Sequence, residues 1–243
     1  MTEKRRISGR TCIITGASSG IGAHLARVMA SEGARVALGA RRTELTEGIA
    51  QEIRNAGGQA LAVPMDVTSE KSVAQAFSSA EDAFGPVDTV IANAGVSRHG
   101  RSTELAEAEL RQVFDTNLLG VHLTANAAAR AMMTAGSRGS GAGRIVIIGS
   151  ITAQLTGQGD AAYAASKAGL IGLAEAWAPL LKARGISINA VAPGFIETQM
   201  TAHIPFALRE AGRRMSSLGQ GGLPQDVAEA VEEELQDLQQ WDV

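Results

Sequence analysis

Residues 11–22 read T-C-I-I-T-G-A-S-S-G-I-G, a short apolar run followed at once by three closely spaced glycines. The apolar run predicts a buried strand, and residues Ile21–Glu32 predict the helix that follows it. Glycines at this turn let the backbone approach a pyrophosphate, and the start of a helix supplies free N–H groups and a positive dipole end. The strand–loop–helix order therefore predicts a dinucleotide site rather than an ordinary tight turn. The residues expected to form it are Gly16, Ser18, Ser19, Gly20, Ile21 and Gly22.

The rest of the chain alternates short β-branched runs with longer alanine-rich stretches. Apolar strands separated by helices are typical of a parallel sheet covered on both faces, so we expect one α/β domain over residues 1–243. The sheet should be doubly wound and Rossmann-type, with about six strands. The strands are expected at Thr11–Thr15, Arg35–Ala40, Ala60–Met65, Thr89–Ala92, Gly143–Gly149 and Ser187–Ala192. The helices are expected at Ile21–Glu32, Glu44–Ala56, Ser69–Ala83, Ala106–Ala135 and Ala162–Ala183.

With 45% apolar and 19% charged residues, the 243-residue chain has the composition of a folded globular protein. Its formal charge of −3 gives no reason to expect binding to nucleic acid, and no apolar run approaches the roughly 18 residues that span a bilayer. The single cysteine, Cys12, cannot build a thiolate metal site, and the four histidines are scattered without ligand spacing. We therefore expect a cytoplasmic protein with no metal, no nucleic-acid partner and no membrane association.

The end of the second expected strand, V-A-L-G-A-R-R at residues 36–42, bears on the choice of dinucleotide. An acid at this point, about 20 residues after the glycine loop, would bind the ribose 2′-hydroxyl of NAD. This chain has Ala40 there, followed by Arg41 and Arg42, and two guanidinium groups suit a 2′-phosphate. We therefore expect NADP(H) as the cofactor. NAD is the alternative if the two arginines are only solvated loop charges.

The only tyrosine, Tyr163, stands four residues before Lys167 in Y-A-A-S-K. On a helix this spacing places both side chains on one face, and an ammonium beside a phenol favours the phenolate. Ser150 lies upstream, at the end of the apolar run R-I-V-I-I-G-S. A hydroxyl, a tuned phenol and a lysine together suit proton transfer to and from a carbonyl oxygen.

These motifs resemble the short-chain dehydrogenase/reductase superfamily, and the resemblance runs from about Gly9 to Val231. It implies that Ser150, Tyr163 and Lys167 are the catalytic trio and that Asn117, in D-T-N-L-L-G, organises a proton-relay water. Tyr163 and Lys167 are also implied to contact the cofactor. The other cofactor-binding residues that the resemblance implies are Asp66, Val67, Asn93, Ala94, Gly95, Pro193, Gly194, Ile196 and Thr198. Ala92 departs from the pattern, because the family usually has an asparagine there.

The resemblance implies an NADP(H)-dependent oxidoreductase that interconverts a small-molecule ketone and a secondary alcohol. The stretch I-N-A-V-A-P-G-F-I-E-T-Q-M, at residues 188–200, is most similar to reductases of 3-oxoacyl thioesters on acyl carrier protein. One alternative is an NAD-linked alcohol or hydroxysteroid-type dehydrogenase of the same fold. Another is a nucleotide-binding protein whose altered C-terminus reduces its activity.

The C-terminal third contains two further expectations. Residues 199–225 are expected to form a substrate lid, with a helical pair packed permanently on the core as the alternative. The end, E-E-E-L-Q-D-L-Q-Q-W-D-V at residues 232–243, has no β-branched run and predicts an exposed helix in place of the family's seventh strand. Because that strand contributes to one subunit interface in relatives, we expect a homodimer, paired through the helices at Ala106–Ala135 and Ala162–Ala183, rather than a tetramer.

Overall fold

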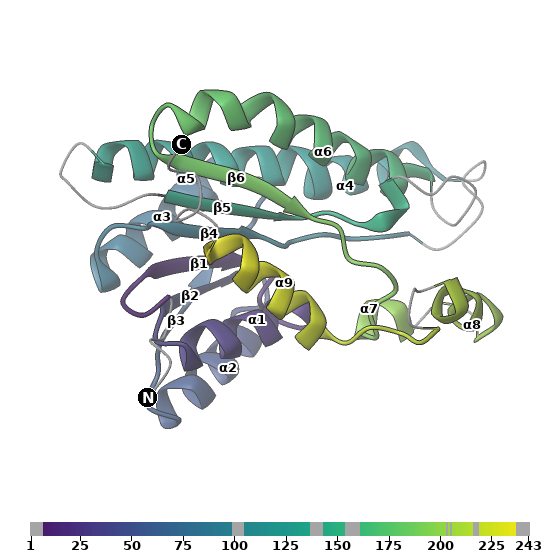
Figure 1. The fold of residues 1–243 in the computed structure, drawn as a ribbon, viewed down its shortest axis with the longest axis horizontal. Coiled ribbons are helices and arrows are strands. Elements are labelled where there is room, and N and C mark those ends of the chain that lie inside the picture. Colours follow the sequence, from purple (N-terminus) through teal and green to yellow (C-terminus); the bar gives the residue numbers. More distant parts are fainter. Residues whose placement is uncertain are drawn as a thin grey trace.

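Six parallel strands form one sheet in the order β3-β2-β1-β4-β5-β6, with helices packed on both faces (Figure 1). The structure, a computed structural model, describes residues 7–98, 105–136, 143–153, 161–202, 204, 206–215 and 219–236. The strands are β1 (Thr11–Thr15), β2 (Arg35–Ala40), β3 (Gln59–Pro64), β4 (Thr89–Ala92), β5 (Gly143–Ile148) and β6 (Ile186–Val191). The α-helices in these ranges are α1 (Gly20–Ser31), α2 (Thr43–Asn55), α3 (Glu70–Phe84), α4 (Glu107–Phe114), α5 (Gly120–Gly136), α6 (Ala161–Lys182), α7 (Gln199–Ala202), α8 (Phe206–Met215) and α9 (Pro224–Gln236).

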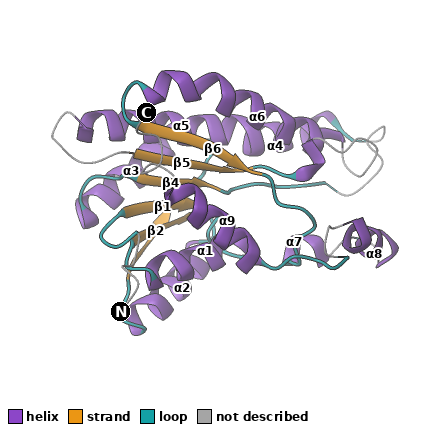
Figure 2. Cartoon of the chain, viewed as in Figure 1, coloured by secondary structure: helices purple, strands orange, loops and turns teal. Residues whose placement is uncertain are grey.

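Successive residues of each strand point to opposite faces of the sheet and so divide the core in two. On one face Cys12 and Ile14 pack with α1, α2 and α9, and on the other Ile13 packs with α3, α5 and α6 (Figure 2). These strand residues are at most 1% exposed. A sheet buried on both faces explains why its strands are near-continuous apolar runs. The prediction of a doubly wound α/β fold is confirmed.

All six expected strands form, each within one residue of the expected bounds. The helix expected over Ala106–Ala135 is instead interrupted, because a π-helical turn, η2 (Asp115–Leu119), separates α4 from α5. In this turn the N–H of Gly120 donates to the carbonyl of Asp115, five residues earlier. The expectation of one continuous helix is wrong here, and such turns are frequent where a helix carries a functional side chain. Asn117 lies in this turn.

The strand order creates a crevice at one edge of the sheet. From β1 the chain runs outward through β2 to β3 and then returns to β4 on the other side of β1. At such a reversal the connections that leave β1 and β4 pass to opposite faces, which opens a binding crevice at the carboxyl ends of the strands. The glycine loop follows β1 and residues 93–95 follow β4, so two of the expected cofactor segments meet there.

The C-terminal helix α9 is less exposed than the sequence predicts. Residues 232–243 were expected to form an exposed helix, and α9 does continue through Gln236, with residues 237–243 outside the described part of the chain. One side of α9 is nevertheless buried in the core: Val231 is fully buried and Leu235 is 4% exposed. The four-residue spacing of this apolar stripe places it on one helix face, which the acidic composition conceals. Among the described residues, β6 pairs only with β5, so its outer edge has no further strand.

Beyond β6 the chain forms α7 and α8 before it returns to α9 (Figure 1). The base of this excursion is closed by a bridge between Ile196 and Gly222, in which the N–H of Glu197 donates to the carbonyl of Gly222 at 2.9 Å. Arg213 on α8 also donates to Glu197, at 2.8 Å. The bridge joins the two ends of the segment expected to be a lid, and Arg213 connects α8 to the same place. The movement of this segment as a lid stays a prediction.

We predict that Leu235→Ala lowers the free energy of unfolding by about 2–4 kcal/mol, because it removes a buried apolar side chain from the core. The control is Glu233→Ala on the exposed side of the same helix, which should change that free energy by less than about 0.5 kcal/mol. Urea unfolding of both variants and the unchanged chain measures the difference. Equal effects of the two substitutions would contradict the packing of α9 described above.

Candidate active site

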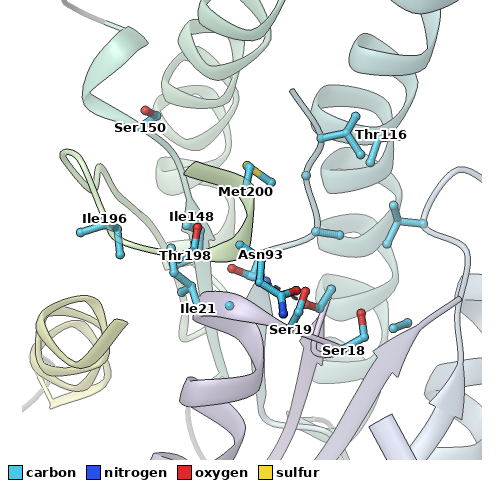
Figure 3. Close-up of a pocket in the computed structure, with 18 of the residues that line it drawn as sticks. Ser18, Ser19, Ile21, Asn93, Thr116, Ile148, Ser150, Ile196, Thr198 and Met200 are labelled. Atoms are coloured by element: carbon cyan, nitrogen blue, oxygen red, sulfur yellow. Dashed lines mark hydrogen bonds between the residues drawn. The ribbon is translucent and has the colours of Figure 1, made fainter. Parts of the chain in front are cut away.

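A cavity of about 350 Å³ lies at the carboxyl ends of the strands and is bordered by segments that follow all six of them. In Figure 3 Ser18 and Ser19 of the glycine loop lie on one side of it, and Met200 and Ser150 lie on the other. The expected site residues that line it are Gly16, Ser18, Ser19, Gly20, Ile21, Arg41, Arg42, Asp66, Val67, Asn93, Ala94, Gly95, Ser150, Tyr163, Lys167, Pro193, Gly194, Ile196 and Thr198. Gly22 and Asn117 lie outside the lining, which additionally includes Ala40, Met65, Val96, Thr116, Ile148, Gly149, Gln199, Met200 and Thr201.

Two glycines of the loop are required by the close approach of other atoms. Gly16 has a φ of +67°, and a Cβ on it would lie 2.8 Å from the Cα of Ala94. A Cβ on Gly22 would lie 2.6 Å from both the carbonyl oxygen of Gly16 and the side-chain nitrogen of Asn93. Gly22 therefore acts behind the cavity, where it lets the start of α1 pack against the segment that follows β4.

Thr15, the last residue of β1, fixes the two cofactor segments to each other and was not among the expected site residues. Its hydroxyl oxygen accepts from the N–H groups of Asn93 and Ala94, both at 3.0 Å. The side-chain amide of Asn93 donates back to the carbonyls of Thr15 (2.9 Å) and Gly16 (3.3 Å). The signal in the sequence is a threonine at the end of an apolar strand, because a hydroxyl that becomes buried there needs hydrogen-bond partners.

The arginines expected to choose the cofactor differ in their contacts. Arg42 donates from one guanidinium nitrogen to the hydroxyls of Ser18 (2.9 Å) and Ser19 (3.0 Å). Arg41 lines the cavity near Asp66 and contributes to the lowering of the pKa of that carboxyl. Ala40, 7% exposed, places a methyl group where an acid would bind the 2′-hydroxyl of NAD. The arrangement holds a cation directly over the glycine loop.

Asp66 is oriented by Thr68 at the end of β3. One carboxylate oxygen of Asp66 accepts from the N–H of Thr68 at 3.0 Å and from its hydroxyl at 2.8 Å. The N–H bond is the main reason that the pKa of Asp66 lies below its ordinary value, with the hydroxyl and Arg41 acting in the same direction. Asp66 therefore stays an ionised hydrogen-bond acceptor at neutral pH, suited to a polar group of the bound ligand.

Lys167 is 3% exposed, and its ammonium donates to the carbonyl of Ile148 at 2.7 Å. Burial lowers the pKa of Lys167 to about 8. The ammonium lies 5.7 Å from the centre of the Tyr163 ring, one helical turn earlier on α6. Gly95, in the segment after β4, lies close to this amine, since a Cβ there would be in ordinary contact with the lysine nitrogen at 3.6 Å. The helix thus places the phenol and the amine together at the cavity, as the i, i+4 spacing predicts.

Asn117 is completely buried in η2, and protein groups use every hydrogen-bonding site of its side-chain amide except one oxygen lone pair. Its oxygen accepts from the N–H of Val96, and its nitrogen donates to the carbonyl of Val96, both at 2.8 Å. The nitrogen also donates to the hydroxyl of Ser166 at 3.1 Å. The side chain therefore ties the segment after β4 to α6 and lies behind the cavity wall. Neighbouring Thr116 lines the cavity instead.

Ser150 lies two residues beyond the end of β5 and is 8% exposed. Pro193, Gly194, Ile196 and Thr198 follow β6 and complete the same side of the cavity. Thr198 immediately precedes the short helix α7, and its N–H donates to the hydroxyl of Thr201 in that helix at 2.9 Å. The fold thus brings the Ser150 hydroxyl, from the end of β5, and the Tyr163 phenol and Lys167 amine, from α6, to one cavity.

These residues fit a dinucleotide. The glycines supply close backbone approach at the start of α1, Arg42 supplies a cation beside the loop, and Asp66 supplies an anionic acceptor at the end of β3. Over the ranges that the structure describes, no group of three or more histidine, cysteine or acidic side chains could hold a metal ion. No helix in the described part of the chain is long and apolar enough to cross a membrane.

A family model described as short chain dehydrogenase matches residues 10–207. The chain belongs to this family. Cis-4-hydroxycyclohexanecarboxylate dehydrogenase of Sinomonas cyclohexanicum is 38% identical to this short-chain dehydrogenase over 226 residues, covering 91% of this chain and 87% of the relative. The 3-oxoacyl-[acyl-carrier-protein] reductase of Thermotoga maritima is 33% identical over 226 residues, covering 93% and 90%.

Solved structures of short-chain dehydrogenases are similar over nearly the whole chain. One from Mycobacterium marinum has a TM-score of 0.87 at 32% identity and covers 96% of this chain and 90% of its own. One from Burkholderia cenocepacia, in complex with NADP, has a TM-score of 0.86 at 32% identity, with 95% and 91% covered. The resemblance read from the sequence motifs is therefore confirmed, and the chain is an oxidoreductase of the type that acts on CH–OH groups with NAD(P).

We predict that Lys167→Met raises the free energy of unfolding at pH 7 by roughly 1–3 kcal/mol, because it removes a charge that burial disfavours. The pKa of Lys167 is about 8 in the fold against 10.5 ordinarily, so the unfolded chain holds the proton more tightly between these values. The destabilisation is complete below pH 8 and fades as the pH rises towards 10.5. Urea unfolding across this range should show the advantage of the variant shrinking, and a gain that grows with pH would contradict the assignment.

Proposed function

We propose that this short-chain dehydrogenase is an NADP(H)-dependent reductase that interconverts a ketone and a secondary alcohol. The observation that carries the cofactor choice is the guanidinium of Arg42, which donates to the hydroxyls of Ser18 and Ser19. A cation already fixed beside the glycine loop suits a 2′-phosphate through charge-assisted hydrogen bonds. Ala40 supports the same choice, since it supplies no acceptor for the 2′-hydroxyl of NAD.

The proposed mechanism assigns one role to each polar group at the cavity. When bound, the cofactor supplies the hydride. Tyr163 protonates the developing alkoxide in reduction and takes the proton from the alcohol in oxidation, while Ser150 donates a hydrogen bond to the same oxygen. Lys167, cationic below about pH 8, stabilises the phenolate and binds the nicotinamide ribose. Asn117 organises the relay water, as the family resemblance implies.

A 3-oxoacyl thioester is the substrate that we propose to test first. Reductases named for 3-oxoacyl-[acyl-carrier-protein] in Thermotoga maritima and Escherichia coli align with 93% and 92% of this chain. Met200 and Phe206, 42% and 68% exposed, give the lid segment apolar side chains that suit an acyl chain. The alternative is an NAD-linked alcohol or hydroxysteroid-type dehydrogenase, which the relative named for a cyclic hydroxy acid favours.

A substrate panel separates these activities. It should include 3-oxoacyl thioesters, cyclic ketones with and without a carboxylate, and a steroid ketone, each with NADPH and with NADH. Reduction of the thioesters with NADPH supports the proposal, and preference for NADH with a cyclic ketone supports the alternative. Cofactor binding without turnover of any substrate would indicate a nucleotide-binding protein of reduced activity.

Three further features belong to this proposal: a single domain with a lid at residues 199–225, a cytoplasmic location and a homodimer. The dimer is supported by exposed apolar side chains on the helices expected to pair, with Leu119 45% exposed and Leu180 69% exposed. Apolar side chains that remain in water on neighbouring helices favour association with a second copy. Light scattering that reports a dimer supports this assembly, and a stable tetramer would contradict it.

Replacing Arg41 and Arg42 together with alanine should weaken NADPH selectively, because only NADPH has the 2′-phosphate. Loss of charge-assisted hydrogen bonds predicts at least about a tenfold change in the ratio of kcat/KM for NADPH to that for NADH. The control replaces Lys182 and Arg184, two exposed cations at the end of α6. This pair removes the same charge and should leave the ratio unchanged. Equal losses for both cofactors in the Arg41/Arg42 variant would refute the 2′-phosphate assignment.

Tyr163→Phe keeps the aromatic ring and removes the proton donor, so kcat should fall by roughly a hundredfold or more. NADPH binding, followed by fluorescence titration, should persist because the ring and Lys167 remain. A variant that keeps most of its turnover would show that the proton comes from another group.

A further inference from the structure

Ser150 is followed by a single 3-10 turn, η3 (Ile151–Ala153), whose middle residue contacts it. The main-chain N–H of Thr152 donates to the hydroxyl oxygen of Ser150 at 3.3 Å, and the hydroxyl of Thr152 donates to the same oxygen at 2.9 Å. Thr152 does not belong to the cavity lining, whereas Ser150 does. Any effect of Thr152 on a ligand in the cavity therefore passes through Ser150.

The two bonds determine what the Ser150 hydroxyl can still do. A serine hydroxyl has one proton to donate and two lone pairs that accept. Thr152 occupies both lone pairs, so the group that remains for a ligand is the proton. Reduction of a carbonyl needs a donor towards the substrate oxygen, on which negative charge develops, and a hydroxyl whose own oxygen accepts hydrogen bonds is a stronger donor.

The turn that holds Thr152 is anchored to the sheet. The N–H of Ile151 donates to the carbonyl of Pro193 at 2.9 Å, and the N–H of Gly149 donates to the carbonyl of Val191 at 2.7 Å. Within the turn, the N–H of Ala153 donates to the carbonyl of Ser150 at 3.1 Å. The main chain on both sides of Ser150 is thus bonded to β6 and to Pro193, two residues beyond it, so the position of Thr152 relative to Ser150 is set before a ligand binds.

We propose that Thr152 is a positioning residue, which saturates the acceptor sites of the Ser150 hydroxyl and thereby directs its proton to the substrate oxygen. This inference rests on the proposed carbonyl reduction, in which Ser150 contacts that oxygen. Thr152 differs in role from the catalytic residues that the sequence motifs imply, because it acts through Ser150 and does not contact substrate or cofactor.

The test is a double-mutant cycle on kcat/KM for the best ketone of the panel with NADPH. It uses Thr152→Val, which keeps the shape of the side chain and removes its hydroxyl, together with Ser150→Ala and the double variant. Thr152→Val should lower kcat/KM about three- to tenfold, the effect of one hydrogen bond. In the Ser150→Ala background the same substitution should have no further effect, because the group on which Thr152 acts is gone.

Thr152→Ser is the matched control, since it restores the hydroxyl and should recover most of the activity. Thermal unfolding and the Kd for NADPH should be the same in all these proteins, which separates positioning from general destabilisation.

Equal losses from Thr152→Val with and without Ser150 would show a structural role and overturn the proposal. Increased activity in Thr152→Val would overturn it too, because it would mean that Ser150 donates to Thr152 and is freed by the substitution. Wild-type protein that reduces no ketone, or Ser150→Ala at full activity, would count against the proposed function itself.

Discussion

The geometry of the site depends on one buried amine. Lys167 is almost completely shielded from water, and the carbonyl at the end of β5 accepts a hydrogen bond from its ammonium. Burial disfavours a charge in such a place, and the hydrogen bond to this carbonyl holds the amine at the carboxyl end of the sheet. Tyr163, one turn earlier on the same helix, lines the same cavity. Burial lowers the pKa of this amine, which means that its charged form costs stability, as is common at catalytic sites.

The ends of β1 and β4, on the cofactor side of the cavity, are joined by hydrogen bonds between neutral groups. Thr15 and Asn93 exchange hydrogen bonds between the ends of β1 and β4, and Gly16 and Gly22 leave space for those contacts. Arg42 is joined to the serines of the loop in the same structure. A site whose groups are already oriented loses less conformational entropy when its ligand binds. The two sides of the cavity are therefore organised differently: one contains a buried amine, and the other is joined by hydrogen bonds of Thr15 and Asn93.

The sequence was sufficient to predict the sheet. Strands that are buried on both faces must be apolar runs, and in a parallel sheet helices must connect one strand to the next. It was also sufficient for the grouping of Tyr163 with Lys167, which follows from helical spacing alone. It was insufficient for the π-turn around Asn117, whose side chain bonds Val96, a contact between distant residues that no local pattern contains. The acidic composition of α9 concealed its buried stripe, which includes Leu235. Thr152 has no motif of its own, and only the three-dimensional turn reveals its contact with Ser150.

The central claim is that the buried ammonium of Lys167 activates the phenol of Tyr163. Because Tyr163 is the only tyrosine, ultraviolet titration of the protein with NADP⁺ bound reports on this phenol directly. An ammonium nearby stabilises the phenolate, and Lys167 keeps its proton only below about pH 8, so the account predicts that phenolate forms at or below about pH 8, about two units under the ordinary value near 10. The same titration of Lys167→Met, in which the charge is absent, should return the pKa to about 10 or above. A wild-type value that stays near 10 and does not respond to the loss of Lys167 would contradict the account.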